Sequence, residues 1–426
     1  MLQTLLQRLT LDADDARSII ERTFGDHPTH HFGFRLWNGQ QVRWGDRQDF
    51  TLVFTEAETF RRCFVSRDPA EFAEAYADGR MLIEGDLWSA VGIASYLRTL
   101  KLGFGDKVRF APKLVLPATR HTVEHDRRDV QAHYDLSDEF FRLFLDEKMV
   151  YSCAYFASPD QSLDRAQERK LDLICKKLGL RPGDSFLDVG CGWGALLIWA
   201  ARHYGVWAHG ITLSDNQAAE ARQRVAQAGL SDRVTIELRH YAELPAEAFD
   251  KVSSVGMYEH VGIPKLPSYF RAMYRSLRPG GLFLNHGITS PDHGVGTTGG
   301  EFIFRQVFPG ADLAPVLQLQ TEMERARFET LDVHSLRPHY SLTLREWFRR
   351  FRARRDEAAR LVPERVLRIW ELYLAGCSQA FDDNVLSIHQ ILAAKPDRHG
   401  RAPIPLVRPD TILGSEPDGM TNGSRH

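Results

Sequence analysis

The sequence predicts an α/β protein in which a parallel sheet carries helices on both faces, preceded by a smaller α+β domain. Three observations favour this class. Apolar strand-like runs alternate with helical segments from about residue 133 to about residue 290, as in successive βαβ units. A glycine-rich turn, Gly190–Gly194, directly follows one of these runs. Before about residue 105 the strand-like runs are short, and Asn38-Gly39 is a strong hairpin signal.

These patterns divide the chain into segments. The first, residues 1–105, has an amphipathic helical start, two strand-like runs on either side of the hairpin signal, and a helix that stops at Gly79. Residues 106–130 are predicted to be a basic linker, and residues 131–395 form the larger α/β domain. The tail, residues 396–426, is polar and broken by proline and glycine, so it is expected to be disordered.

The composition is typical of a soluble globular protein and excludes several classes. The 426 residues carry a formal net charge of −2, which argues against a polybasic nucleic-acid binder. No apolar run reaches the ~18 residues needed to cross a bilayer. The first residues lead directly into charge, unlike a signal peptide. The five cysteines lack metal-ligand spacing, so we expect reduced thiols, no metal site and a cytoplasmic protein.

The most informative segment is Ser185–Gly194, a strand that ends at Asp188 followed by a Gly-x-Gly-x-Gly turn that opens a helix. Glycine lets a backbone approach a ligand closely, but such a turn alone would also suit a dinucleotide. The next strand ends in Ile211–Ser214 and lacks the acid that would hold an NAD ribose. The pattern is similar to class I S-adenosylmethionine methyltransferases, which have a Rossmann-like sheet.

This similarity assigns polar groups to the cofactor. Asp188 is expected to organise the amino-acid tail or the glycine turn. Thr212 and Gln217 are expected near the ribose, and Ser214 with Gln217 fits a capping box. Tyr241 and Ala242 are expected beside the adenine.

Five further blocks resemble one family, the cyclopropane-fatty-acyl-phospholipid synthases, over about residues 70–390. The blocks are His133–Phe141, Met149–Phe156, Val255–Gly262, Leu284–Ile288 and Tyr340–Trp347. The first two are also similar to plant coclaurine-type N-methyltransferases, so they leave the acceptor open.

The resemblance implies a role for each matching position. The residues expected at the cofactor are Tyr151, Ser152, Asp188, Gly190, Gly192, Gly194, Thr212, Leu213, Gln217, Tyr241, Ala242 and Val255. The residues expected at the reacting centre, around a bicarbonate ion, are Cys153, Glu259, His286, Ile288 and Tyr340. Ile288 would act through its backbone, and the Cys153 amide would donate to the ion.

Family members add a one-carbon unit from S-adenosylmethionine to the cis double bond of an unsaturated phospholipid chain. An alkene is a poor nucleophile, so proximity must supply much of the rate. The resulting carbocation requires a dry pocket, and a base that removes a proton from the new methyl group closes the cyclopropane. The aromatic faces of Tyr134, Tyr258 and Tyr340 are candidates for stabilising the cation.

Three positions depart from the family pattern. Gln306 stands where tyrosine is usual, Gly287 where threonine is common, and Asn285 where the family has an apolar residue. These positions are expected near the acyl pocket or the base. They raise an alternative product, a methylene- or methyl-branched chain, formed when a neighbouring chain carbon loses the proton.

The acceptor implies contact with a membrane. Arg349–Arg355 is a cationic run with Trp347, Phe348 and Phe351 interleaved, so it fits either anionic lipid or an ordinary solvated helix face. We expect a peripheral protein at the inner face of the membrane that binds no nucleic acid. The N-terminal domain is expected to present the acyl chain or to dock a second subunit as a homodimer, and a partner reductase stays open.

Two alternatives to the phospholipid enzyme come from other classes. A small-molecule amine N-methyltransferase would act on soluble amines without lipid. A lipid-binding pseudoenzyme would show no cofactor turnover, and the intact glycine turn makes it the weakest of the three hypotheses.

Overall fold

Contacts divide the computed structural model into two compact units, each built from separate stretches of the chain. The first comprises residues 1–118, 295–307 and 354–379, and the second comprises 119–294, 308–353 and 380–426. The residues that the structure describes are 11–29, 31–66, 69–99, 136–291, 302–303 and 306–403. The predicted linker 106–130, the block residues His133–Asp135 and the tail beyond residue 403 lie outside these ranges.

The first unit contains a four-stranded sheet of order β2-β1-β3-β4. Its strands are β1 (Phe32–Arg35), β2 (Gln41–Arg43), β3 (Phe50–Phe54) and β4 (Met81–Gly85). Strands β1 and β2 pair as an antiparallel hairpin whose turn contains Gly39 at φ +88°, which confirms a hairpin at Asn38-Gly39. The strand after the turn is Gln41–Arg43, however, and not the expected run Phe50–Phe54. Strand β3 pairs in parallel with β1 and antiparallel with β4.

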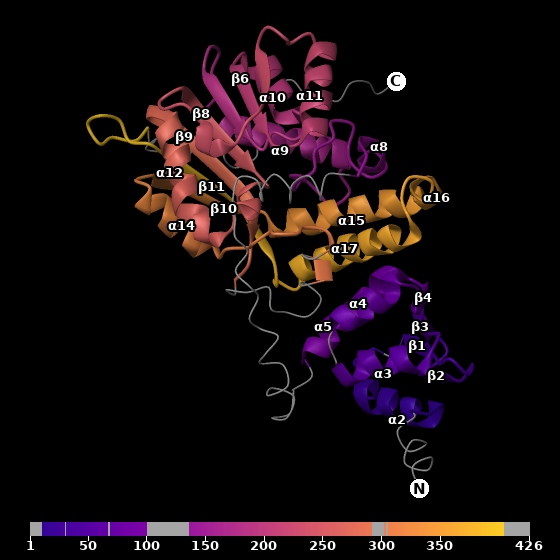
Figure 1. Cartoon of the computed structure of the whole chain (residues 1–426). Helices are drawn as coiled ribbons and strands as arrows, with labels where there is room; N and C mark the ends of the chain where they lie inside the picture. Colours follow the sequence, from indigo (N-terminus) through magenta and orange to yellow (C-terminus); the bar gives the residue numbers. More distant parts are fainter. Residues whose placement is uncertain are drawn as a thin grey trace. The chain divides into compact units, whose positions relative to one another are not determined.

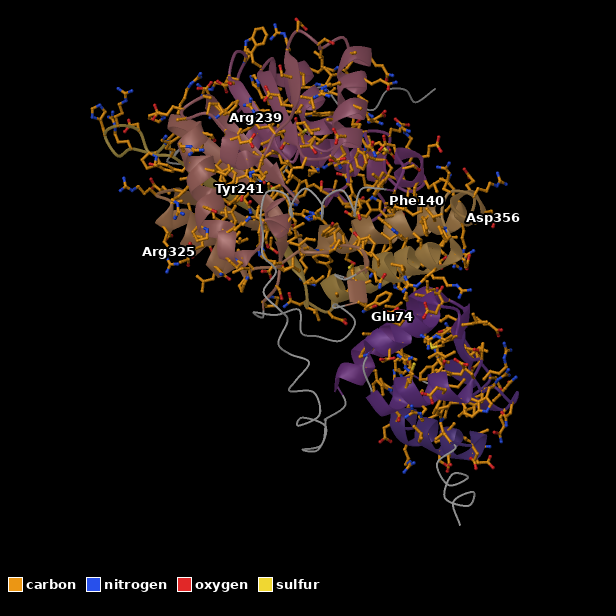
Figure 2. All side chains as sticks on the ribbon, viewed as in Figure 1. Glu74, Phe140, Arg239, Tyr241, Arg325 and Asp356 are labelled. Carbon is orange, nitrogen blue, oxygen red and sulfur yellow. The ribbon has the colours of Figure 1, made fainter. Side chains whose placement is uncertain are left out.

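Helices and a phenylalanine-rich core complete the first unit. The helices are α2 (Ala13–Phe24), α3 (Ala57–Ser66), α4 (Pro69–Ala77), α5 (Leu87–Thr99), α16 (Arg355–Ala358) and most of α17 (Glu364–Asp382). Glu74 of α4, labelled in Figure 2, accepts a hydrogen bond from Arg365 of α17 at 2.9 Å. The contacts thus group 354–379 with the N-terminal segment, although these residues fall within the 131–395 range expected for the catalytic domain.

The second unit is built on a seven-stranded sheet of order β10-β11-β9-β8-β5-β6-β7. Its strands are β5 (Ser185–Val189), β6 (Trp207–Thr212), β7 (Val234–Leu238), β8 (Phe249–Val255), β9 (Leu277–Thr289), β10 (Glu329–Ser335) and β11 (Ser387–Ala394). Strands β5 to β9 pair in parallel, whereas β11 pairs antiparallel with both β9 and β10. The βαβ prediction from about residue 133 to 290 is confirmed.

Helices cover both faces of this sheet (Figure 1). Those on one face are α9 (Leu163–Lys177), α10 (Ala195–Tyr204) and α11 (Asp215–Gln227), and those on the other are α12 (Leu266–Ser276) and α14 (Val316–Arg325). Strand residues alternate between two apolar clusters: Phe186 packs with the first group and Leu187 with the second. This confirms the predicted α/β class.

Short elements position the site at the carboxyl ends of the parallel strands. They are α8 (Asp138–Phe141) and the 3₁₀ turns η2 (Tyr241–Glu243), η3 (Tyr258–His260) and η4 (Ile263–Lys265), with helix α15 (Arg337–Ala353) nearer the chain end. Within the described ranges, no helix combines the length and the apolar character needed to cross a bilayer.

Candidate active site

The glycine turn between β5 and α10 forms the floor of a cavity. Gly190, Gly192 and Gly194 all have positive φ, between +53° and +81°, a region that other residues rarely occupy. A Cβ added to Gly192 would meet no atom within 4 Å. The backbone N–H groups of Gly190 and Cys191 both donate to the Ile211 carbonyl and so tie the turn to the end of β6.

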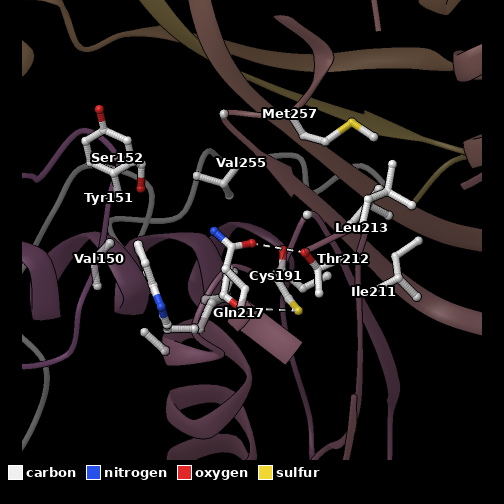
Figure 3. Close-up of a pocket in the computed structure, with 18 of the residues that line it drawn as sticks. Val150, Tyr151, Ser152, Cys191, Ile211, Thr212, Leu213, Gln217, Val255 and Met257 are labelled. Carbon is white, nitrogen blue, oxygen red and sulfur yellow. Dashed lines mark hydrogen bonds between the residues drawn. The ribbon is translucent and has the colours of Figure 1, made fainter. Parts of the chain in front are cut away.

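The cavity has an empty volume of about 1090 Å³, which includes open solvent at its mouth. Of the twelve predicted cofactor residues, ten line it: Tyr151, Ser152, Asp188, Gly190, Gly192, Thr212, Leu213, Gln217, Tyr241 and Val255 (Figure 3). The other two, Gly194 and Ala242, do not line the cavity. Gly194 begins α10 and approaches Ala221, and the Ala242 carbonyl accepts from Arg275.

Polar side chains at the end of β6 hold one another in position through hydrogen bonds. The Thr212 hydroxyl donates to the Gln217 amide oxygen at 3.0 Å, as the dashed line in Figure 3 marks. Ser214 is the N-cap of α11, and its hydroxyl accepts from the Gln217 backbone N–H at 3.3 Å. The predicted helix start is therefore confirmed, and the Gln217 side chain is turned to Thr212 beside the cavity.

Asp188 is a buried acid at the end of β5. Its side chain accepts from the Ser253 hydroxyl at 2.6 Å. Burial raises its pKa to about 6, although the Ser253 bond and the charge of Lys170 act in the opposite direction. Asp188 lines the cavity at the glycine turn, where the sequence analysis expected it.

The cavity also contains Lys170, which was not among the residues predicted from the sequence. Lys170 lies on α9, is 2% exposed, and donates from Nζ to the Ser152 hydroxyl at 2.8 Å. It stands four residues from both Ala166 and Ile174, within the apolar stripe of the helix. A lysine placed between Ala166 and Ile174 in this stripe is the sequence signal that would have identified it.

Glu259 lies in η3, just after β8, and is 5% exposed. Its Oε1 accepts the Ile288 backbone N–H at 2.8 Å, whereas its Oε2 has no hydrogen-bond partner among the described residues. Burial raises its pKa to about 7, and the Ile288 bond opposes that rise. Ile288 was expected to contribute to the ion through its backbone, and its N–H is already used by Glu259.

His286 lies on β9 and is 1% exposed. Its Nδ1 lies 3.2 Å from the amide nitrogen of Gln390, which can only donate, so Nδ1 accepts and the ring proton is on Nε2. Nε2 has no partner among the described residues. Burial, followed by the charges of Lys170 and Lys177, holds the pKa of His286 well below its usual value, so the imidazole is neutral.

Cys153 and Tyr340 are connected to this strand through Leu336. The Cys153 thiol donates to the Ala154 carbonyl at 3.2 Å and lies 3.9 Å from the Leu336 carbonyl, and burial raises its pKa. The Leu336 N–H donates to Ile388, which is paired with Ile288 on β9. Tyr340, in the first turn of α15, donates its backbone N–H to the carbonyl of the same Leu336.

None of the five predicted reacting-centre residues lines the glycine-turn cavity, but their neighbours do. Met257, His260 and Val261 flank Glu259 in sequence and belong to the cavity wall. The reacting-centre residues are therefore grouped by the contacts around Ile288, beside the cofactor cavity rather than within its lining.

The three sequence departures have different environments. A Cβ on Gly287 would collide with the ring of Tyr258 and lie 3.1 Å from Glu259 Oε1, which explains why glycine replaces a larger residue here. Asn285 is 1% exposed, and neither its Oδ1 nor its Nδ2 has a partner among the described residues. Gln306 belongs to the first unit and accepts from Arg365 at 3.2 Å.

The cavity fits S-adenosylmethionine on the chain's own chemistry. The open face at Gly192, the paired Thr212 and Gln217, the buried Asp188 and the Lys170 ammonium provide close backbone approach, neutral polar groups and both signs of charge. These are the groups that a nucleoside carrying a charged amino-acid tail requires.

Comparison with known proteins gives one family. Residues 121–391 match the family described as mycolic acid cyclopropane synthetase. A probable fatty acid methyltransferase of Pseudomonas putida is 41% identical over 384 residues, which cover 88% of this chain and 95% of that protein.

Two solved structures of cyclopropane synthases are similar to this chain. The cyclopropane synthase MmaA2 from Mycobacterium tuberculosis is 35% identical with a TM-score of 0.61, and the match covers 66% of this chain and all of that chain. The mycolic acid cyclopropane synthase CmaA1, complexed with SAH and CTAB, is 37% identical with a TM-score of 0.60, covering 63% of this chain and 98% of that chain.

Proposed function

Because the chain belongs to the mycolic acid cyclopropane synthetase family and is an S-adenosylmethionine-dependent methyltransferase, we propose that it modifies an unsaturated phospholipid chain. It adds one carbon to the cis double bond and gives a cyclopropane fatty acyl chain. The observation that carries this proposal is a pair of buried atoms near Ile288, Glu259 Oε2 and His286 Nε2, neither of which has a hydrogen-bond partner among the described residues.

The chemistry assigns separate tasks to the two sites. S-adenosylmethionine, when bound, supplies an electrophilic methyl group. Val255 and Met257 line the cavity next to the reacting-centre segment and exclude water from the developing carbocation. The alkene gains a methyl group there and must then lose a proton before water adds.

Glu259 and His286 suit a small oxyanion such as bicarbonate, which supplies a mild base when held. His286 donates from Nε2, since Nδ1 is occupied by Gln390. Glu259 Oε2 accepts from the hydroxyl of such an ion while Oε1 keeps the Ile288 N–H. Tyr340 and the Cys153 backbone amide are proposed as further donors, as the family resemblance implies.

A second product, an exomethylene branch, stays the alternative that the three sequence departures raise. Asn285 is buried, and both of its polar atoms lack partners among the described residues. Its side chain lies on the same face of β9 as Phe283, whereas His286 shares the opposite face with Leu284, because successive strand residues alternate. Loss of a chain proton instead of a methyl proton gives the branch from the same carbocation.

The test is the fatty-acid profile of a bacterial host that lacks its own cyclopropane synthase, with and without this protein. Gas chromatography with mass spectrometry detects the added carbon, and proton NMR separates ring protons from vinylic protons. Glu259→Gln should lose the product, whereas Glu324→Gln, at an exposed position of α14, should retain it. Folded protein that yields no new lipid but methylates a soluble amine would overturn the proposal.

We also infer contact with the inner face of a membrane, because the proposed acceptor is a phospholipid. The arginine run adds little support: Arg349 pairs with Glu346, Arg350 pairs with Asp164, and Trp347 and Phe351 are fully buried. Sedimentation with anionic and zwitterionic vesicles at low and high salt tests this inference. Failure to bind either vesicle would overturn it.

A further inference from the structure

Lys170 places a buried positive charge beside the cofactor cavity. The residue lies in the middle of α9 and lines the cavity together with Ser152, Asp188 and the glycine turn. Its Nζ donates to the Ser152 hydroxyl at 2.8 Å. A lysine is almost never this deeply buried unless its ammonium group has a partner.

The hydrogen bonds of this ammonium group are incomplete. Lysine has three N–H donors, and within the part of the chain that the structure describes one acceptor, the Ser152 hydroxyl, is in reach. A buried charged donor without an acceptor is costly. The two remaining donors lie at a cavity that the chain itself does not fill.

The neighbouring carboxyl groups do not accept hydrogen bonds from these donors. Asp146 accepts the backbone N–H groups of Lys148 and Val150, and Asp188 accepts from Ser253. Both carboxyl groups act on Lys170 only through their charge. Burial lowers the pKa of Lys170 to about 8 and the charge of Asp146 opposes this, so the group is mainly protonated at pH 7.

The wall beside Lys170 is held firmly. Gln167, one turn earlier on α9, donates to the Ser152 carbonyl at 2.8 Å and to the Val150 carbonyl at 3.3 Å. Helix α9 therefore fixes the Val150–Ser152 segment through both Gln167 and Lys170. A ligand group bound here meets a preorganised surface.

We propose that Lys170 recognises the carboxylate of the amino-acid tail of S-adenosylmethionine. This carboxylate is the one anionic group of that cofactor. Its oxygens accept from the Lys170 N–H donors that Ser152 does not use. It also cancels a charge that would otherwise repel the sulfonium cation in the same cavity. The cavity thus selects the complete cofactor over fragments that lack the carboxylate.

The inference concerns cofactor binding and does not depend on the lipid acceptor. A failure of the proposed lipid chemistry would leave it unchanged, because the readout is binding without turnover. The probes are S-adenosylhomocysteine and its decarboxylated analogue, which keeps the adenosine, the thioether and the amine.

Calorimetry on the full-length protein gives the test. The native protein should bind S-adenosylhomocysteine on the order of 10- to 100-fold more tightly than the decarboxylated analogue. Lys170→Met should weaken binding of S-adenosylhomocysteine by about that factor and leave the analogue unchanged. The variant should then bind S-adenosylhomocysteine and the decarboxylated analogue with an affinity ratio close to one.

Two further variants separate recognition from structure. Lys176→Met, on the same helix, removes a partly exposed lysine paired with Asp172 and should keep the full preference. Lys170→Gln keeps a donor for Ser152 without the charge, so it should lose the preference even if Lys170→Met fails to fold. Equal binding of the two probes by the native protein, or an equal loss of both in Lys170→Gln, would overturn the proposal.

Discussion

Burial has opposite effects on the two ionisable side chains expected at the reacting centre. It raises the pKa of Glu259 to about 7 and holds the pKa of His286 well below its usual value. Near pH 6 both groups are therefore mainly uncharged. A bound oxyanion would then carry the negative charge at the reacting centre. Glu259 would act by holding this oxyanion.

The first residue-scale prediction separates turnover from cofactor affinity. Glu259→Gln keeps an oxygen for the Ile288 N–H but changes the other atom from an acceptor to a donor. We expect turnover to fall on the order of 10²-fold or more, while the affinity for S-adenosylhomocysteine changes by less than about twofold. Steady-state kinetics and calorimetry measure the two quantities. Equal losses of both would contradict a role confined to the reacting centre.

The second prediction concerns stability and pH. Because the pKa of Glu259 is raised from 4.5 to about 7 in the folded state, its contribution to stability is full below pH 4.5 and is lost as pH rises through 7. Glu259→Gln has no ionisable group at this position, so its stability does not fall with pH for this reason. The stability of the variant relative to the native protein should rise between pH 5 and pH 8 by up to about 3 kcal/mol. Denaturant unfolding at both pH values measures the change, and a pH-independent difference would refute it.

Local motifs explain which residues were predictable. Gly190, Gly192, Thr212 and Gln217 follow directly from one turn and one helix start in the sequence, and all of them line the cavity. The apolar stripe of α9 marks Lys170 as a candidate buried lysine, but its hydrogen bond to Ser152, eighteen residues away, depends on the fold. The fit of Gly287 depends likewise on the ring of Tyr258. No local pattern encodes these contacts.

At the scale of elements, the alternation of strand-like and helical segments predicted the strands but not their order in the sheet. The runs between β5 and β9 gave the parallel part of the sheet correctly, since each βα unit repeats one local pattern. The antiparallel pairing of β11 with β9 joins residues about 100 positions apart, such as His286 with Gln390, and its pairing with β10 joins residues more than 50 positions apart. In the first unit the parallel pairing of β1 with β3 likewise depends on tertiary contacts.

A buried ion pair joins α9 to β10 and provides the element-scale prediction. Lys177 Nζ lies 3.0 Å from Asp332, with side chains 0% and 2% exposed. Lys177→Met leaves the buried carboxylate without its charged partner and should cost about 3–5 kcal/mol. Adding Asp332→Leu should recover most of that loss. Denaturant midpoints of the single and double variants measure it, and strictly additive losses would show that the two side chains are not coupled.

At the scale of the whole molecule, the chain is organised by contacts that cross long stretches of sequence. In the first unit, Tyr76 donates to Glu371 at 2.9 Å, and Arg355 donates to the same carboxylate at 3.0 Å. Arg365 bonds both Glu74 and Asp78. Helix α17 thus completes the N-terminal unit, although composition alone gave no reason to separate it from the segment around it.

Removal of residues 1–118 tests how far cofactor binding is independent of the first unit. The described residues that line the cavity all lie between Met149 and Val261, within the second unit. The matched MmaA2 chain corresponds to about two thirds of this one. We expect the truncated protein to bind S-adenosylhomocysteine within about twofold of the full chain. Its melting temperature should fall, because Glu371 and Arg365 lose Tyr76, Glu74 and Asp78. Tyr76→Phe in the full chain removes one of these bonds and should give a small part of that fall. Loss of binding by a folded truncated protein would show that the first unit contributes to the cofactor site.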